Sequence, residues 1–298
     1  MKLYTAEDMA TQWEISVQMV RRYCREGKVP GARQTEQGWM IPEGTLKPGT
    51  ELKREVPQTP LVKKILYQRE RNQHFGIYEY IQVNLAYSSS RMASNRLTRN
   101  QVEEIYRTNR ITTSFEATKV DDIVEIKNHF ICMRYVVDNI TAPLTVSFIK
   151  QVHYLLTYGT YADQIHQTGV GEFRIKPDKL GIPPQQINKE LANLIKLYEK
   201  KAANLEQILS FHVQLERIHP FTDYNGRVGR IIMMKECLRY GIDPFIIDDK
   251  RRGEYNRGIA RWDMNPETLN NTVSEAQKRF QAKLEVCRLM EYHRPPKK

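Results

Sequence analysis

The 298-residue sequence has no long hydrophobic run. A helix that spans a membrane needs about 20 mostly apolar residues, whereas the longest aliphatic run near the motif described below is Ile231–Met234. The first residues, Met1–Glu7, also lack the apolar core of a secretion signal. The sequence therefore predicts a protein with no membrane segment.

Cysteine is scarce. The four cysteines are scattered at Cys24, Cys132, Cys237 and Cys287, with no Cys-x-x-Cys pair and no Cys/His cluster. Structural zinc and a disulfide framework are therefore not expected, and a reducing cytoplasm is the simplest setting. The histidines show no metal-ligand spacing either, and His212 is expected in the core or on the surface.

Internal repeats and low-complexity tracts are absent, and the charge is strongly one-sided. The formal net charge is +11, which is typical of proteins that contact nucleic acid. Residues 1–55, however, contain nine Lys/Arg and eight Asp/Glu, so the excess lies in the rest of the chain. The charge alone therefore does not predict nucleic-acid binding.

The length predicts about two domains. Residues 1–46 form one expected unit, and residues 47–60, rich in Pro, Gly, Thr and charge, form a linker. Residues 61–275 are expected to form the main domain, and residues 276–298 a basic, solvated tail.

The expected N-terminal unit has two capped helices followed by a hairpin. Thr5 and Ser16 are candidate N-caps, and the second helix exposes Arg21, Arg22 and Arg25. A short hairpin is expected within residues 29–42. This pattern resembles the winged helix-turn-helix of MerR-like and excisionase-like proteins, which implies DNA binding through the three arginines. A small protein-interaction or dimerisation domain remains the alternative.

The most informative segment is His219–Arg230, with the sequence HPFTDYNGRVGR. Apolar residues at helical spacing predict a helix over residues 205–218, which Pro220 ends. A second helix is expected from Gly226 to Tyr240. The motif is therefore a loop that leads into the N-terminus of a helix.

Each residue type in this loop suits phosphate chemistry. Free N–H groups at the helix N-terminus form an anion site, and Gly226 allows close approach to the backbone. Arg227 and Arg230, three residues apart, can both reach a phosphate. Asp223 offers a Mg²⁺ ligand. His219 is suited to accept a hydroxyl proton near neutral pH. Taken singly, the histidine could instead cap a helix and the arginines could form a solvated face.

The segment resembles the Fic signature HPFxxGNGRxxR and departs from it at one defined position. The resemblance extends over residues 61–262 and includes Gly171–Arg174, Tyr255 and Trp262. It implies a mainly α Fic-type helical bundle with a β-hairpin flap, and transfer of AMP from ATP to a Ser, Thr or Tyr hydroxyl on a protein, which could be the chain itself.

The resemblance also implies residue roles. His219 would be the general base and Asp223 the Mg²⁺ ligand. The following set would bind ATP and its phosphates: Asn225, Gly226, Arg227, Val228, Gly229, Arg230, Tyr255 and Trp262. The flap, within residues 173–183, would hold a target segment as an added strand, through Lys176, Leu180 and Gly181. A simple loop between helices is the alternative for these residues.

Two departures from the family pattern bear on activity. Tyr224 stands where the family has Gly, so the loop either keeps φ below zero there or changes its geometry. Residues 88–98 resemble the inhibitory segment of the family, Ser/Thr-x-x-x-Glu-Gly/Asn. Ser89 fits the first position and Asn95 matches in the flank, but Ser94 stands at the Gly/Asn position and Ala93 replaces the glutamate that pairs with the second motif arginine. Arg230 is therefore expected to be free for phosphate. An ordinary serine-rich helix cap is the alternative.

The remaining expected helices cover residues 62–85, 101–107, 120–139, 145–156 and 184–200. The leading hypothesis is a protein AMP-transferase joined to a DNA-binding module. The alternatives are a transcriptional regulator whose Fic-like domain senses a nucleotide, and an enzyme that uses another nucleotide or a phosphocholine-bearing donor. The sequence is compatible with a homo-oligomer but does not fix the oligomeric state.

Overall fold

The computed structural model describes residues 3–29, 31–43, 45, 47–48, 59–112, 118–161, 163, 169–200 and 203–292, with side chains to residue 287. Most of the expected linker, 47–60, and the end of the expected tail, 293–298, lie outside these residues. None of the helices in the described part has the length and apolar character needed to cross a membrane.

The N-terminal unit has two helices and a three-stranded antiparallel sheet. Its elements are β1 (Leu3–Thr5), α1 (Ala6–Trp13), α2 (Val17–Arg25), β2 (Arg33–Thr35) and β3 (Gly38–Pro42). The strand order is β1-β3-β2, and Tyr4 pairs with Ile41. Thr5 and Ser16 cap α1 and α2 as expected. The expected hairpin is therefore present, and β1 adds a strand that its short length hid in the sequence.

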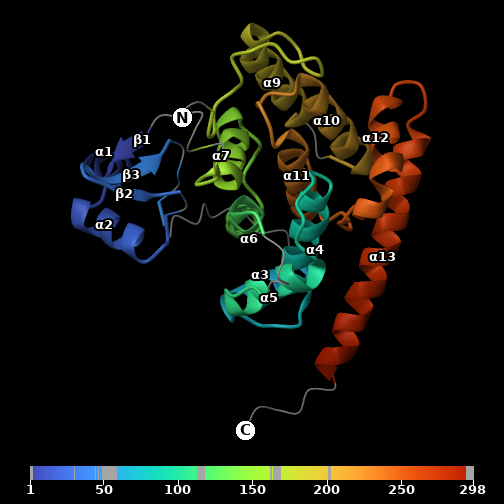
Figure 1. The fold of residues 1–298 in the computed structure, drawn as a ribbon, viewed down its shortest axis with the longest axis horizontal. Helices are drawn as coiled ribbons and strands as arrows, with labels where there is room; N and C mark the ends of the chain where they lie inside the picture. Colours follow the sequence, from blue (N-terminus) through green and yellow to red (C-terminus); the bar gives the residue numbers. More distant parts are fainter. Residues whose placement is uncertain are drawn as a thin grey trace.

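The remaining described helices form one bundle (Figure 1). They are α3 (Pro60–Glu70), α4 (Ile77–Arg91), α5 (Arg99–Thr108), α6 (Val120–Asp138), α7 (Val146–Thr157), α9 (Pro184–Tyr198), α10 (Leu205–Ile218), α11 (Asn225–Tyr240), η1 (Asp249–Arg251), α12 (Arg252–Ala260) and α13 (Glu267–Tyr292). The N-terminal unit lies on one side of the bundle and α13 on the other. The fold is mainly α, as expected.

Helix α11 lies at the centre of the core. The run Ile231–Met234 is buried on every side, not on one face only, because α4, α6, α7 and α10 all contact this helix. The charged pair Lys235 and Glu236 is also buried, with the ammonium group donating to the Glu236 carboxylate and to the carbonyl oxygen of Ala142. The loop at residues 219–224 therefore leads into a helix that is enclosed by the core.

Three expectations about secondary structure were wrong. The helix expected over residues 62–85 is split, because Asn72 and Phe75 adopt positive φ and the Gln68 side chain accepts a hydrogen bond from the Tyr78 amide at the start of α4. The expected tail begins inside α13, which continues to Tyr292. Residues 173–183 form no paired strands, since Pro177 and Pro183 lack N–H groups for a ladder.

The N-terminal unit contacts the bundle through α7. The hydroxyl of Tyr154 donates a hydrogen bond to the carbonyl oxygen of Gly31, 3.0 Å away. Gly31 has φ of +75°, and a Cβ placed there would lie 2.5 Å from the Tyr154 ring. A glycine is therefore required at this contact, both for the backbone conformation and for the close approach.

Candidate functional site

The loop between α10 and α11 forms one wall of a cavity of about 220 Å³. His219 ends α10 in the left-handed conformation, with φ of +49°. The Asn225 side chain fixes the loop, since its Oδ1 accepts from the Phe221 amide and its Nδ2 donates to the Phe221 carbonyl oxygen. Because these two bonds close the loop, His219 and the N-terminus of α11 face the same cavity.

His219 has a polar group near each ring nitrogen, and only the contact at Nε2 has hydrogen-bond geometry. Asn225 Nδ2 lies 3.1 Å from Nε2, and Asp178 Oδ2 lies 3.1 Å from Nδ1. Burial lowers the pKa of His219, while Asp178 opposes this effect. A histidine that is neutral near pH 7 can accept a proton, so the geometry is compatible with a general base.

Asp223 lies at the mouth of the cavity with its side chain 74% exposed. Its Oδ1 accepts from the Tyr224 amide and from Arg227. Within the described part of the chain, Oδ2 has no partner, and no group of three or more His, Cys, Asp or Glu residues forms a metal site. Mg²⁺ that is shared with phosphates needs only one or two protein carboxylates, so the donor set fits such an ion.

Arg227 lines the cavity but is already engaged. Its Nη1 lies 3.0 Å from Glu125 Oε1, its Nη2 lies 3.1 Å from Asp223 Oδ1, and its guanidinium carbon stands 3.2 Å from the centre of the Tyr224 ring. The side chain is 5% exposed. Two carboxylates therefore balance the charge that was expected to contact phosphate.

Tyr224 keeps the backbone conformation that suits glycine. Its φ is +66°, so the first of the two alternatives, a φ below zero, is wrong. The strain has compensating contacts: the ring packs edge-on to His153 and beneath Arg227, and the hydroxyl donates to Glu125. The phenol of Tyr224 thus occupies space beside the loop that a glycine would leave open.

Arg230 is buried and reaches α4. Its Nε donates to Ser89 Oγ at 2.9 Å, and its Nη2 donates to the Ser89 carbonyl oxygen at 3.1 Å. Ala93 lines the cavity beside it. The expectation of a free Arg230 is therefore only partly met: no carboxylate pairs with it among the described residues, but a serine holds it.

Residues 88–98 also act as a structural turn. Asn95 is buried, and its Nδ2 donates to the Asp122 carbonyl oxygen and to Glu125 Oε2. Thr98 caps α5 through a capping box with Gln101. The segment therefore contacts Arg230 through Ser89 and not through position 93, and it forms the helix cap of the alternative.

The other residues expected to bind ATP divide into two groups. Gly226 and Tyr255 line the cavity. Val228 is fully buried in the core, and its amide donates to the Tyr224 carbonyl oxygen. A Cβ on Gly229 would lie 2.6 Å from His212, so this glycine serves helix packing. Trp262 packs in a hydrophobic cluster and does not line the cavity.

Sequence reasoning missed Glu125 and Glu216. Glu125 contacts Tyr224 and Arg227 from α6, 99 residues before Tyr224. Glu216 lines the cavity from α10, and burial raises the pKa of its carboxyl group. Glu216 precedes the motif by three residues on a helical face shared with His212 and His219, and this spacing is the one signal that could have identified it.

The expected flap is a loop that Arg174 holds against the motif. This buried guanidinium donates to the carbonyl oxygens of His219, Lys176 and Ile182. Leu180 is 75% exposed. A Cβ on Gly181 would lie 2.7 Å from His219 Cβ, so the loop passes close to His219. The segment thus lies beside His219, although its expected strands are not formed.

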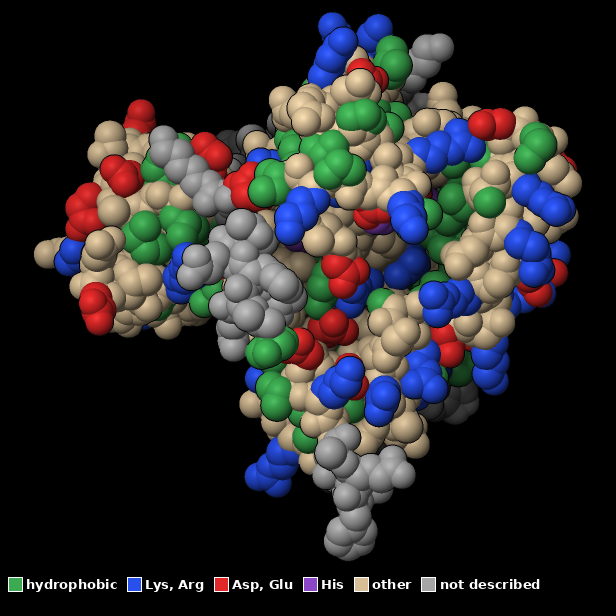
Figure 2. All heavy atoms as spheres, turned by 45° about the horizontal axis from the view of Figure 1, so that its top comes forward, with side chains coloured by type: hydrophobic (Ala, Val, Ile, Leu, Met, Phe, Trp, Pro, Cys, Tyr) green, Lys and Arg blue, Asp and Glu red, His purple; other side chains and the backbone are tan. Residues whose placement is uncertain are grey.

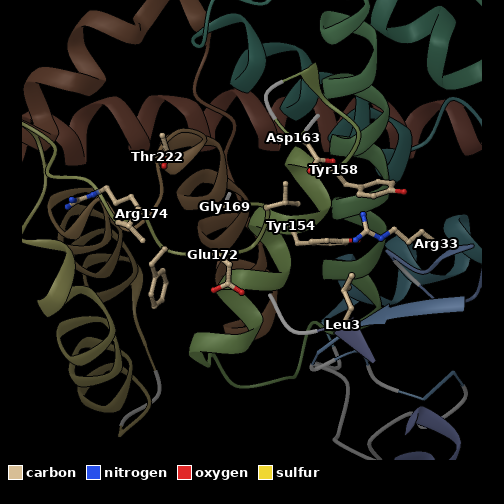
Figure 3. Close-up of a pocket in the computed structure, with 12 residues that line it drawn as sticks. Leu3, Arg33, Tyr154, Tyr158, Asp163, Gly169, Glu172, Arg174 and Thr222 are labelled. Carbon is tan, nitrogen blue, oxygen red and sulfur yellow. The ribbon is translucent and has the colours of Figure 1, made fainter. Parts of the chain in front are cut away.

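A larger cavity of about 640 Å³ adjoins the flap. Figure 3 shows Arg33 from the N-terminal unit directed toward Tyr154 and Tyr158, with Arg174 and Thr222 on the opposite side. Thr222 lines both cavities. Figure 2 shows acidic and basic side chains meeting in a hollow of the face drawn, with Lys and Arg around it.

The three arginines of the expected DNA-binding helix are on the surface of α2. Arg21 pairs with Glu7 at 2.6 Å, and Arg22 pairs with Glu26 at 2.7 Å. Arg25 is exposed. Surface ion pairs of this kind contribute little to stability and exchange readily for other partners.

Residues 143–237 match the model of the Fic/DOC family. The chain is 28% identical over 180 residues to a protein adenylyltransferase Fic from Drosophila erecta, and 29% identical over 182 residues to one from Drosophila mojavensis. Each alignment covers 57% of this chain and 34% of the relative. The chain thus matches about a third of the length of these relatives.

Solved structures agree on the fold. A Fic-domain-containing signalling protein from Bacteroides thetaiotaomicron aligns with a TM-score of 0.60 at 18% identity, over 76% of this chain and 95% of that one. Residues 134–508 of Fic-1 from C. elegans align with a TM-score of 0.59 at 15% identity, over 76% and 70%. Residues 143–237 therefore match a Fic domain, and the helical body around them has the fold of these solved Fic structures.

Proposed function

We propose that this protein transfers AMP from ATP to a Ser, Thr or Tyr hydroxyl of a protein, either a partner or itself. The observation that carries the proposal is the placement of His219 Nε2 at the cavity where the N-terminus of α11 and Arg230 also meet. A proton acceptor and an anion site are thereby joined in one cavity, as nucleotidyl transfer requires.

In the proposed reaction, His219 Nε2 accepts the proton of the target hydroxyl. The hydroxyl oxygen forms a bond to the α-phosphorus of ATP, and the bond from that phosphorus to the bridging oxygen breaks. Pyrophosphate leaves with the electron pair, and the target keeps AMP. Free N–H groups at the start of α11 and the guanidinium of Arg230 stabilise the negative charge.

The remaining groups have supporting roles in the proposal. Gly226 leaves the backbone of the first helical turn open, and Tyr255 lines the nucleotide side of the cavity. Asp223 would hold Mg²⁺, which when bound would neutralise phosphate charge. The loop around Lys176 and Leu180 would align the target segment. Val228 and Gly229 would contribute to the helix and its packing.

The decisive experiment uses ATP labelled on the α-phosphate, with ATP labelled on the γ-phosphate as a parallel sample. Label on protein from the first donor but not from the second indicates AMP transfer. Label on protein from γ-labelled ATP but not from α-labelled ATP would indicate phosphorylation and overturn the proposal. Labelled CDP-choline in a third sample tests a phosphocholine-bearing donor.

A second candidate function is a nucleotide sensor with weak transfer, linked to transcription through the N-terminal unit. The engaged state of Arg227, which Glu125 and Tyr224 hold, favours this alternative. It predicts that ATP binds, as measured by calorimetry, while no protein becomes labelled. DNA affinity that changes with ATP would support this function directly.

A further inference from the structure

Asp178 lies beside His219 on the loop between Arg174 and Pro183. Its Oδ2 lies 3.1 Å from His219 Nδ1, and its Oδ1 accepts a hydrogen bond from the Leu180 amide at 2.8 Å. The backbone bond fixes one carboxylate oxygen. The other oxygen is therefore directed at the imidazole ring by the local turn and not by chance rotation of an exposed side chain.

The opposite side of the ring defines its proton position. The Asn225 amide nitrogen can only donate, so it donates to His219 Nε2, which must carry a lone pair. In the neutral ring the hydrogen is then on Nδ1, the atom that faces Asp178. The Asn225 amide thus selects this tautomer, and the negative charge of Asp178, 3.1 Å from Nδ1, favours it electrostatically.

We propose that Asp178 is a positioning residue for His219. Its carboxylate holds the hydrogen on Nδ1 and stabilises the imidazolium that forms when Nε2 accepts a proton. The base role of His219 rests on the function proposed above, whereas the pairing with Asp178 does not. The other charged groups that face the ring are Arg174, from the same loop, and Asp223. The positive charge of Arg174, which holds the loop in place, disfavours a positively charged imidazole. The negative charge of Asp178 offsets this effect.

This pairing links the target-binding loop to the base. Arg174 ties the loop to the His219 carbonyl oxygen at 2.7 Å, and a Cβ on Gly181 would lie 2.7 Å from His219 Cβ. A shift of the loop would therefore move the carboxylate away from Nδ1. The Asp178 carboxylate therefore lies beside His219 Nδ1 only while the loop that would hold the target keeps its position against the motif.

The variant Asp178→Asn tests the inference in the full chain, because its amide oxygen can still accept from the Leu180 amide while the negative charge is lost. Nitrogen-15 NMR of the imidazole groups, with His219→Gln to assign the signal, reports both tautomer and titration. The wild type should show hydrogen on Nδ1, and Asp178→Asn should lower the pKa of His219, since a carboxylate stabilises the charged ring. An unchanged pKa would overturn the inference, whether or not the protein transfers AMP, because Asn225 alone can maintain the tautomer.

Transfer kinetics give the second readout. Asp178→Asn should lower kcat about tenfold, less than the 10²–10⁴ that a general base contributes, because His219 remains. The KM for ATP should change little, and the acid limb of the kcat/KM profile should move to lower pH. Lys189→Ala, at an exposed position of α9, should leave the rate and profile unchanged. A rate loss without a shift of the profile would assign Asp178 to loop structure only.

Discussion

The hydroxyl of Tyr224 donates a hydrogen bond to Oε1 of Glu125, 2.7 Å away. The same oxygen lies 3.0 Å from Arg227 Nη1. A bulky residue at a glycine position thus brings a carboxylate from α6 to the first motif arginine. The side chain at position 224 therefore determines how much of the charge of Arg227 is available to a ligand.

Removal of the Tyr224 hydroxyl should weaken this arrangement without disturbing the ring. Tyr224→Phe should lower the free energy of unfolding by about 1 kcal/mol, the typical contribution of one hydrogen bond. It should also raise ATP affinity, because Glu125 is held less firmly on Arg227. Urea unfolding and calorimetry measure the two effects. Weaker ATP binding in this variant would contradict the view that Tyr224 restrains Arg227.

Substitution of His219 should separate catalysis from binding. His219→Ala should reduce label transfer from α-labelled ATP by about 10²–10⁴, the contribution of a positioned base. The ATP dissociation constant should change little, because the phosphate contacts come from other groups. His74→Ala, a partly exposed histidine far from the motif in sequence, is the matched control. Near-normal transfer by His219→Ala would exclude this residue as the base.

A glutamate at position 93, where the family pattern has one, should inhibit the proposed transfer activity. Ala93 lines the cavity beside Arg230, so Ala93→Glu should place a carboxylate near that guanidinium and displace the Arg230 bonds to Ser89. Charge-assisted pairs are about twice as strong as neutral hydrogen bonds. Self-labelling and ATP affinity should both fall, whereas the neutral Ala93→Gln should retain most of both. Equal labelling by all three proteins would leave residues 88–98 as a helix cap alone.

DNA binding should depend on α2. Replacement of Arg21, Arg22 and Arg25 by alanine should reduce DNA affinity and flatten its dependence on salt, since each phosphate contact releases counterions. Alanine at Lys278, Arg279 and Lys283 of α13 removes the same charge elsewhere and should have little effect. Gel-shift titrations at two salt concentrations compare the variants. A larger loss in the α13 variant would assign DNA binding to the C-terminal helix.

Buried histidines should make the fold sensitive to acid. Burial lowers the pKa of His129, His153 and His212 to about 3 each, below the unfolded value of 6.5. The unfolded state therefore binds more protons below pH 6.5, so stability present above that pH is lost as the pH falls toward 3. When the pH falls from about 7 to about 5, each of these histidines should lower the free energy of unfolding by about 2 kcal/mol.

His129 offers the sharpest test of this pH dependence, because neither of its ring nitrogens has a hydrogen-bond partner among the described residues. His129→Leu should reduce the change in unfolding free energy between these two pH values by about 2 kcal/mol, the contribution of one such histidine. Urea titrations at both pH values measure it. An identical pH dependence in the variant would show that His129 is protonated, or solvated, in the folded protein.

Local sequence signals predicted the helices better than the contacts between them. The helix over residues 205–218 and the start of α11 near Gly226 followed from apolar spacing and Pro220, and both are present. Glu125 could not be predicted, because its contact with Tyr224 joins positions 99 residues apart and a single sequence carries no record of such a pairing. Long-range partners are set by packing, not by propensity.

The flap illustrates the opposite limit. Its position was predicted from the resemblance, but its structure was not, because the prolines in residues 173–183 and the carbonyl contacts of Arg174 prevent a ladder. The charges at Arg227 and Arg230 were predicted as well, whereas their engagement by Glu125 and Ser89 was not. The sequence identifies the charged groups, and the fold determines which of them already have a hydrogen-bond or ion-pair partner.

The burial of α11 on all sides has a practical consequence for ligand discovery. A molecule that binds in the cavity at the N-terminus of this helix is coupled to cooperative melting of the whole bundle, because the helix cannot loosen while the core persists. Binding should therefore appear as a rise in melting temperature of the kind expected for a ligand that prefers the native state. A thermal-shift panel of nucleotides, read on unlabelled protein, would rank candidate donors before any acceptor is known.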